Sequence, residues 1–220
     1  GDPAAYQTMD AGIVSYGRHQ ATLQSGTLHS VLQAYFRRSG SETSRALQQE
    51  FAARVEQRDA GLRHDARLKE LLLAAAVEPE MGAAQDEVFD RQFFQPAVAQ
   101  ARQRSLRTPL GVACLYDTQI QGGLFILLPR ADARAGGSVG DAGGVSEASW
   151  LAAFLDEREA RLLALADQAE ARGDSASARA LRVSTFRVTE YRTLLAANNL
   201  WLEGELLIRG RRVAGLTFGT

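Results

Sequence analysis

Residues 109–121 read PLGVACLYDTQIQ, a stretch that is apolar on most sides of a helix. Pro109 favours a helix start, because its fixed φ suits the first turn and its missing N–H has no partner there. A helix that is apolar nearly all round is a buried one. We therefore expect residues 109–121 to form the central helix of the fold.

Apolar residues recur at helical spacing on both sides of this stretch. The predicted helices cover residues 27–38, 42–58, 64–76 and 84–105 before it, and residues 147–171 and 175–197 after it. Pro96 should interrupt the helix over 84–105 near Gln95, since the residue before a proline avoids helical backbone. Residues 130–149 are rich in Gly, Ala, Ser and Asp, which predicts a surface loop.

Two short segments have a different pattern. Residues 11–17 place β-branched and aromatic residues between glycines, which indicates a hairpin strand. Residues 200–220 alternate weakly around Arg209-Gly210-Arg211, which predicts a terminal hairpin with a tight turn. The chain is therefore expected to be mainly α, with a small β element near its start.

Composition limits the classes of function. The chain has 220 residues, 45% of them hydrophobic, which is enough to bury the core of one domain or of two tightly joined lobes. Its net charge of −1 provides no long-range attraction to nucleic acid or to a membrane surface. No apolar run is long enough to span a bilayer, and no signal peptide is present. The abrupt start at Gly1-Asp2-Pro3 suggests a fragment of a longer protein.

Cysteine and histidine usage argues against a metal or cofactor site. Cys114 is the only cysteine, which excludes an internal disulfide, and its apolar surroundings predict a buried structural thiol. His19, His29 and His64 form no pair at metal-ligand spacing. A serine-nucleophile motif is absent as well. We expect no cofactor.

Residues 6–20, YQTMDAGIVSYGRHQ, hold the most informative group of polar side chains. Asp10 stands at the mouth of a predicted turn into a strand, where backbone would fix a carboxylate that stays open to solvent. A general base that holds a water against a sugar ring needs this arrangement. An aspartate that only caps a turn is the alternative. The side chains expected to contact substrate or water are Tyr6, Gln7, Ser15, Tyr16, Arg18, His19 and Gln20.

A second carboxylate of interest is Asp117, which lies in the otherwise apolar stretch. A buried carboxylate needs a partner, and Arg158 and Arg192 are the expected ones. A supporting ion network is the favoured interpretation, ahead of direct catalysis.

Three parts of the chain together resemble the family 46 chitosanases and the wider lysozyme-like superfamily. They are the predicted hairpin at 10–17, the stretches FQPAVAQA (94–101) and LYDTQIQG (115–122), and the stretches WLAAFLDER (150–158) and YRTLLAAN (191–198). The resemblance implies a mainly α, two-lobed lysozyme-like fold with a small β-hairpin at the active-site cleft. It also implies that residues 1–220 form a single catalytic domain, whose N-terminal helix is missing here.

The resemblance further implies hydrolysis of a β-1,4 glycosidic bond by two carboxylates. Inversion of configuration, the outcome in that family, requires about 6.5–9.5 Å or more between them. Asp10 matches the base, with Asp2 as a weaker candidate. Asp117, Arg158 and Arg192 match positions of a supporting ion network.

The acid of the family is a glutamate shortly before the hairpin. No glutamate precedes Asp10 in this chain, and the first one is Glu42. We expect the acid to lie upstream of this chain, and the chain by itself to be nearly inactive.

The near-neutral, arginine-rich composition favours peptidoglycan as the substrate, with its carboxylate-bearing peptides; chitosan is the alternative. The hairpin also resembles lysozyme-like domains of bacterial cell-wall hydrolases and antibacterial effectors. That resemblance implies secretion or delivery to the periplasm, and an immunity or inhibitor protein as a further partner. A non-catalytic glycan-binding module and a helical scaffold remain the alternatives outside enzymes.

Overall fold

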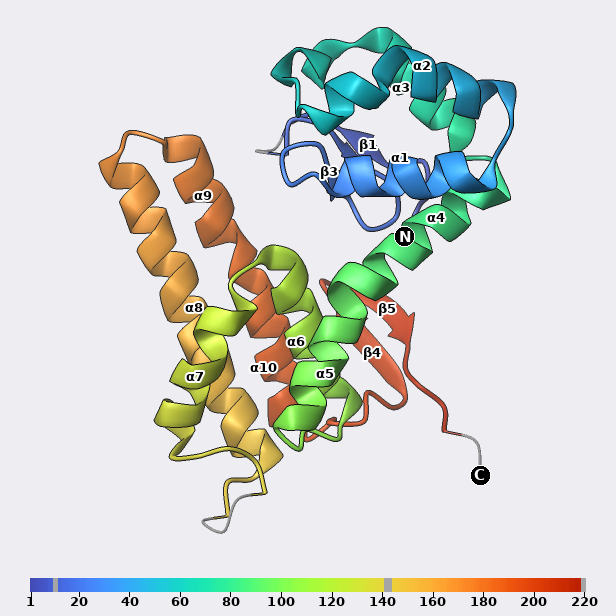
Figure 1. Ribbon diagram of the computed structural model, residues 1–220. Coiled ribbons are helices and arrows are strands. Elements are labelled where there is room, and N and C mark those ends of the chain that lie inside the picture. Colours follow the sequence, from blue (N-terminus) through green and yellow to red (C-terminus); the bar gives the residue numbers. More distant parts are fainter. Residues whose placement is uncertain (10–11, 141–143, 219–220) are drawn as a thin grey trace. The chain divides into compact units, whose positions relative to one another are not determined.

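The computed structural model describes residues 1–9, 12–140 and 144–218 and is mainly α, as predicted (Figure 1). It divides into two compact units, Gly1–Phe93 and Phe94–Thr220. Each unit has its own cluster of buried apolar side chains. None of the helices in the described parts of the chain combines the length and apolar character needed to cross a membrane.

Unit 1 begins with a small antiparallel sheet in the order β1-β2-β3. Its strands are β1 (Tyr6–Gln7), β2 (Ser15–Tyr16) and β3 (Ala21–Thr22). Tyr6 pairs with Tyr16, and Ser15 pairs with Thr22, so β2 is the middle strand. The predicted strand within residues 11–17 is thus confirmed, and β3 is an addition to it.

The helices of unit 1 pack around this sheet. They are α1 (Thr27–Arg38), α2 (Glu42–Glu56), the 3-10 helix η1 (Ala60–His64), α3 (Ala66–Ala75) and α4 (Pro79–Phe89). The predictions over 27–38, 42–58 and 64–76 are confirmed as α1, α2 and α3. The hydroxyl of the buried Tyr16 donates to the carbonyl of Leu72 at 2.8 Å, which ties the sheet to α3.

The proline-broken helix is confirmed, with a displaced start. α4 begins at Pro79, a first-turn position that suits proline, and not at residue 84. A π-helical turn, η2 (Asp90–Phe94), follows it, and α5 (Gln95–Gln103) begins one residue before Pro96. Proline has no N–H to donate to the preceding turn, so the regular ladder is interrupted at this point.

Unit 2 contains α6 (Pro109–Gln121), α7 (Leu124–Ala135), α8 (Glu147–Ala171), α9 (Ser175–Ser184) and α10 (Phe186–Ala196). α6 contacts α5, α7 and α10, as expected of a central helix. Cys114 on α6 is fully buried, which confirms its predicted place in the core. The hydroxyl of Thr108 accepts from the Gly111 N–H at 3.2 Å and caps the helix start.

Two predictions in this unit are wrong in part. α7 extends through residues 130–135, and the prediction of a loop over 130–149 fails there. Its buried side chains, Leu124, Leu127, Leu128 and Ala131, recur at helical spacing and hold the helix together despite Pro129 inside it. The helix predicted over 175–197 is two helices, which meet at Thr185.

The predicted terminal hairpin is confirmed as β4 (Glu205–Ile208) and β5 (Arg211–Ala214). Arg209 and Gly210 between them have φ of 51° and 72°. Two residues with positive φ suit a tight turn whose twist matches that of the strands.

Candidate functional site

The predicted catalytic base, Asp10, lies outside the described residues, but the chain on both sides of it is described. On one side, the carbonyl of Thr8 accepts a hydrogen bond from Nη1 of Arg63. On the other side, the carbonyl of Gly12 accepts from the Val14 N–H at 2.8 Å and the Gln24 N–H at 3.1 Å. The flanks of Asp10 are therefore held by hydrogen bonds within unit 1.

Ile13, three residues after Asp10, has an unusual backbone. Its φ is 68°, while its side chain is buried at 9% exposure. A β-branched residue in the left-handed region is a true outlier, and such strain persists only where the surroundings over-determine it. Outliers of this kind cluster at functional sites, which fits a site at the neighbouring Asp10.

The structure corrects two of the expected substrate contacts. Ser15 and Tyr16 both have 0% exposure, because β2 is the middle strand and both of its faces are covered. Their side chains offer no surface to a sugar. They belong to the core of unit 1 and do not enter the site.

A polar group remains accessible on β1 and the turn before β3. The amide of Gln7 donates to Oε1 of Gln20 at 3.2 Å, and the amide of Gln20 donates to the carbonyl of Gly17 at 3.1 Å. Tyr6 lies beside them on β1, with Nζ of Lys69 5.6 Å from its ring centroid. Partial burial, and then the nearby charge of Asp65, raises the pKa of the Tyr6 hydroxyl, so it stays a hydrogen-bond donor at neutral pH.

Arg18 and His19 lie on the other end of the same turn and face a shared carboxylate. Nη1 of Arg18 contacts both oxygens of Asp86, at 3.2 and 3.0 Å, and Nε2 of His19 lies 3.3 Å from Oδ1. The His19 ring stacks on Phe89 at 4.6 Å between centroids. Sequence reasoning missed Asp86, since no local pattern connects it to two residues 68 and 67 positions earlier.

Asp2, the weaker candidate for the base, has a turn-capping role. Its Oδ1 accepts the Ala4 N–H at 2.8 Å, and its carbonyl accepts the Ala5 N–H at 3.2 Å. The residue is exposed. This contact is the usual local role of an aspartate in a turn.

In unit 2, the predicted ion network is present around Asp117. Its Oδ2 accepts from Nη2 of Arg158 at 2.6 Å, and its Oδ1 accepts from Nη1 of Arg187 at 2.5 Å. Oε1 of Gln121 accepts from Nε and Nη2 of Arg158 at 3.1 and 2.6 Å. The Arg158 side chain is only 1% exposed, so this network supports a fully buried charge.

Arg192 does not belong to that network, which corrects the prediction. It donates to Oε2 of Glu159 at 2.6 Å and to Oδ1 of Asp156 at 2.7 Å. Arg187, which sequence reasoning missed, takes its expected place beside Asp117. The two arginines are five residues apart on α10, a rotation of about 140°, so they face different neighbours.

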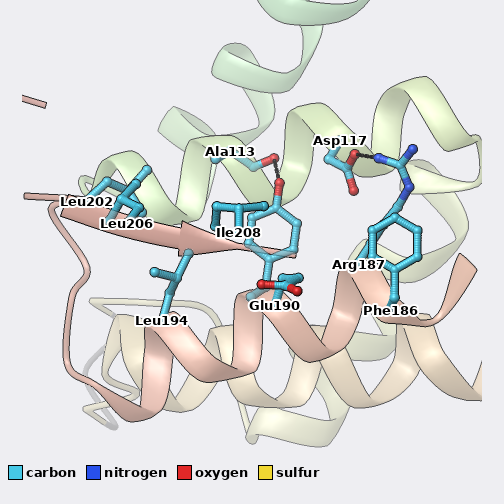
Figure 2. Close-up of a pocket in the computed structure, with 10 residues that line it drawn as sticks. Ala113, Asp117, Phe186, Arg187, Glu190, Leu194, Leu202, Leu206 and Ile208 are labelled. Carbon is cyan, nitrogen blue, oxygen red and sulfur yellow. Dashed lines mark hydrogen bonds and ion pairs between the residues drawn. The ribbon is translucent and has the colours of Figure 1, made fainter. Parts of the chain in front are cut away.

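Beside Asp117 lies a pocket of about 280 Å³ between α6, α10 and the inner face of β4 (Figure 2). Its lining residues are Ala113, Asp117, Phe186, Arg187, Glu190, Tyr191, Leu194, Leu202, Leu206 and Ile208. Tyr191 donates to the carbonyl of Ala113 at 3.1 Å, and burial raises the pKa of its hydroxyl. Figure 2 shows the ion pair at one end of the pocket and leucines at the other.

The described residues provide no metal site and no activated thiol. No group of three or more His, Cys, Asp or Glu side chains in the described ranges is arranged to hold a metal ion. Burial raises the pKa of the Cys114 thiol well above its ordinary value, which disfavours the thiolate that a nucleophile needs.

Comparison with known families assigns the chain to one of them. Residues 16–206 match the model of glycosyl hydrolase family 46 and cover parts of both units. The chain belongs to glycosyl hydrolase family 46. The resemblance seen in the sequence is thereby confirmed, and the mainly α fold is the lysozyme-like fold of this family.

Individual relatives of this family 46 chain agree with the assignment. A chitosanase of Bacillus subtilis (strain 168) is 35% identical over 61% of this chain, and the match spans 48% of that relative's own length. A Gynuella sunshinyii chitosanase in complex with chitotetraose has a TM-score of 0.79 at 27% identity, covering 96% of this chain and 88% of that one. A mutant chitosanase of Bacillus subtilis MY002 complexed with 6 GlcN has a TM-score of 0.77 at 26% identity, covering 96% and 86%.

Proposed function

We propose that this family 46 chain is a chitosanase, which hydrolyses β-1,4 bonds between glucosamine units of chitosan. The observation that carries the proposal is the family match over residues 16–206. Its support is the solved relatives, two of which were captured with glucosamine oligomers. These relatives favour chitosan over peptidoglycan, which the sequence composition alone favoured.

The proposed base is Asp10. In an inverting mechanism, the base removes a proton from water as the water attacks the anomeric carbon from the face opposite the leaving group. A second carboxyl group gives its proton to the departing glycosidic oxygen. A base whose neighbours along the chain are held by hydrogen bonds meets the requirement for one well-placed water.

Tyr6, Gln7 and Gln20 are the proposed contacts for sugar hydroxyl and amino groups near Asp10. Each offers a polar side chain that is at least partly open to solvent. Arg18 and His19 support that surface through Asp86. Asp117, Arg158 and Arg187 support unit 2 from inside and are not proposed to touch the reacting atoms.

The test is the release of new reducing ends from chitosan and from peptidoglycan, measured side by side with the natural full-length protein. We expect cleavage of chitosan, and a loss of at least about 100-fold in Asp10→Asn, because the amide cannot accept the proton of the attacking water. Asp2→Asn is the matched control and should keep its rate within about threefold. Cleavage of peptidoglycan alone would return the assignment to a lysozyme-type enzyme, and binding without cleavage of either polymer would leave a glycan-binding module.

We also propose that the enzyme acts outside the cytoplasm, where the polymer is met. An immunity or inhibitor protein as a partner stays a prediction from the sequence.

A further inference from the structure

We propose that Arg63 is a positioning residue for the segment that carries Asp10. The inference rests on the proposed role of Asp10 as the general base. Arg63 comes from η1, 55 residues further along the chain than the Thr8 carbonyl that it contacts. Its effect on the reaction would be indirect, through the backbone that leads into Asp10.

The contact is suited to fixing backbone. A guanidinium donates through several N–H groups in one rigid plane, so its bond to a carbonyl sets direction as well as distance. Thr8 and Arg63 are both partly buried, while Met9, the next residue toward Asp10, is 91% exposed. Thr8 is therefore a held point two residues before Asp10.

The short helix that carries Arg63, η1, is held at both of its ends through one arginine of α2. Nε of Arg54 on α2 donates to Asp59 at 2.8 Å, and its Nη1 donates to Asp65 at 3.0 Å. Asp59 accepts the Gly61 N–H at 2.8 Å at the start of η1, and Asp65 accepts the Leu68 N–H at 3.0 Å in the helix that follows. The hydrogen bond from Arg54, together with the Gly61 N–H, holds the pKa of Asp59 below its usual range.

The opposite flank of Asp10 is fixed independently. The carbonyl of Gly12 accepts two backbone hydrogen bonds, and Ile13 keeps a φ of 68° that the chain would not adopt alone. With one flank fixed by backbone, the other needs its own anchor, and within the described part of unit 1 the Arg63 contact supplies it. Removing Arg63 therefore loosens the segment from one side only.

Replacing Arg63 is expected to lower the catalytic rate more than the stability of the fold. A displacement of about 1 Å in a catalytic group can lower the rate about 100-fold without affecting ground-state binding in proportion. We expect Arg63→Met to lower kcat for chitosan hydrolysis about 10- to 100-fold, with KM within about threefold. Arg63→Lys, which retains a donor for the Thr8 carbonyl, should recover part of the loss.

The matched control is Arg67→Met. Arg67 lies four residues later, and its side chain is 48% exposed and pairs with Glu50 and Glu70 on the surface. The kcat and the thermal midpoint of the Arg67→Met variant should stay close to those of the wild type. Equal kcat values in Arg63→Met, Arg67→Met and the wild type would overturn the inference.

A second measurement does not depend on activity. Amide hydrogen exchange of a peptide over residues 6–14 should be faster in Arg63→Met than in the wild type and Arg67→Met, while peptides from α1 and α4 keep their protection. If the wild type cleaves no chitosan, the proposed function fails while this result still shows whether Arg63 anchors the segment. Unchanged exchange over residues 6–14 would sink the inference even in an active enzyme. Should Arg63→Met fail to fold, Arg63→Gln takes its place with the same expected direction.

Discussion

At the scale of single residues, Arg158 carries a buried charge that must be neutralised by a partner. Its side chain is 1% exposed, and the side chain of Asp117, whose carboxylate neutralises it, is 16% exposed. Removing one partner of such a pair leaves a buried charge uncompensated, which typically costs about 3–5 kcal/mol. We expect Asp117→Ala to lower the free energy of unfolding by about 3 kcal/mol in urea titrations.

Asp167→Ala is the control for this prediction. Asp167 also pairs with an arginine, Arg182, but its side chain is 71% exposed. Exposed pairs contribute about 0–1 kcal/mol, so this substitution should have little effect. Equal losses in the two variants would contradict a special role for burial at Asp117.

Some of these side-chain contacts could be predicted from the sequence and others could not. The need of Asp117 for an arginine was evident from a carboxylate in an apolar helix, and Arg158 was identified correctly. Arg187 was not, since a choice between two arginines on one helix depends on which face of α10 meets α6. Asp86 and Arg63 act over long separations along the chain, and nothing local marks either of them.

At the scale of elements, Glu78 joins three helices. It directly precedes α4, and its carboxylate accepts from Tyr35 at 2.7 Å, Ser39 at 2.9 Å and Ser41 at 2.9 Å, near the end of α1 and the start of α2. Burial alone would raise the pKa of Glu78, but these hydroxyls and that of Thr43 outweigh it and hold the pKa below its usual range.

A depressed pKa makes this junction sensitive to acid. The stabilisation is present above the unfolded-state pKa of about 4.3 and is lost as pH falls through the lower folded-state value. We expect the wild type to lose more unfolding free energy between pH 6 and pH 3 than Glu78→Gln, which has no such proton to take up. Parallel pH profiles in urea titrations would refute this.

Element boundaries divide into those that local signals set and those that packing sets. α1 and α8 begin and end at the predicted residues, since apolar spacing and flanking polar residues agree there. The end of α7 was missed because the Gly, Ala, Ser and Asp content of residues 130–149 indicated a loop, while burial of one helix face decided the outcome. The break at Thr185 has no proline or glycine beside it and was not predictable from the pattern.

At the scale of the whole molecule, the family could be recognised from the sequence, whereas net charge favoured a substrate, peptidoglycan, other than the one proposed from the family match. Several weak motifs in the right order indicated family 46, and the match over residues 16–206 confirms it. The near-neutral, arginine-rich composition favoured peptidoglycan, but net charge is an average over the entire surface. Substrate choice depends on the few side chains that line a site, and an average over the chain contains little information about them.

The burial of Cys114 has a practical consequence for spectroscopy. As the sole thiol of the chain, fully enclosed in unit 2, it should stay unlabelled by maleimide dyes while the protein is folded. A probe attached through Met9→Cys, at a side chain that is 91% exposed, would then be the only label on the molecule. Its fluorescence anisotropy would follow, in real time, how saccharide binding changes the motion of the residue next to Asp10.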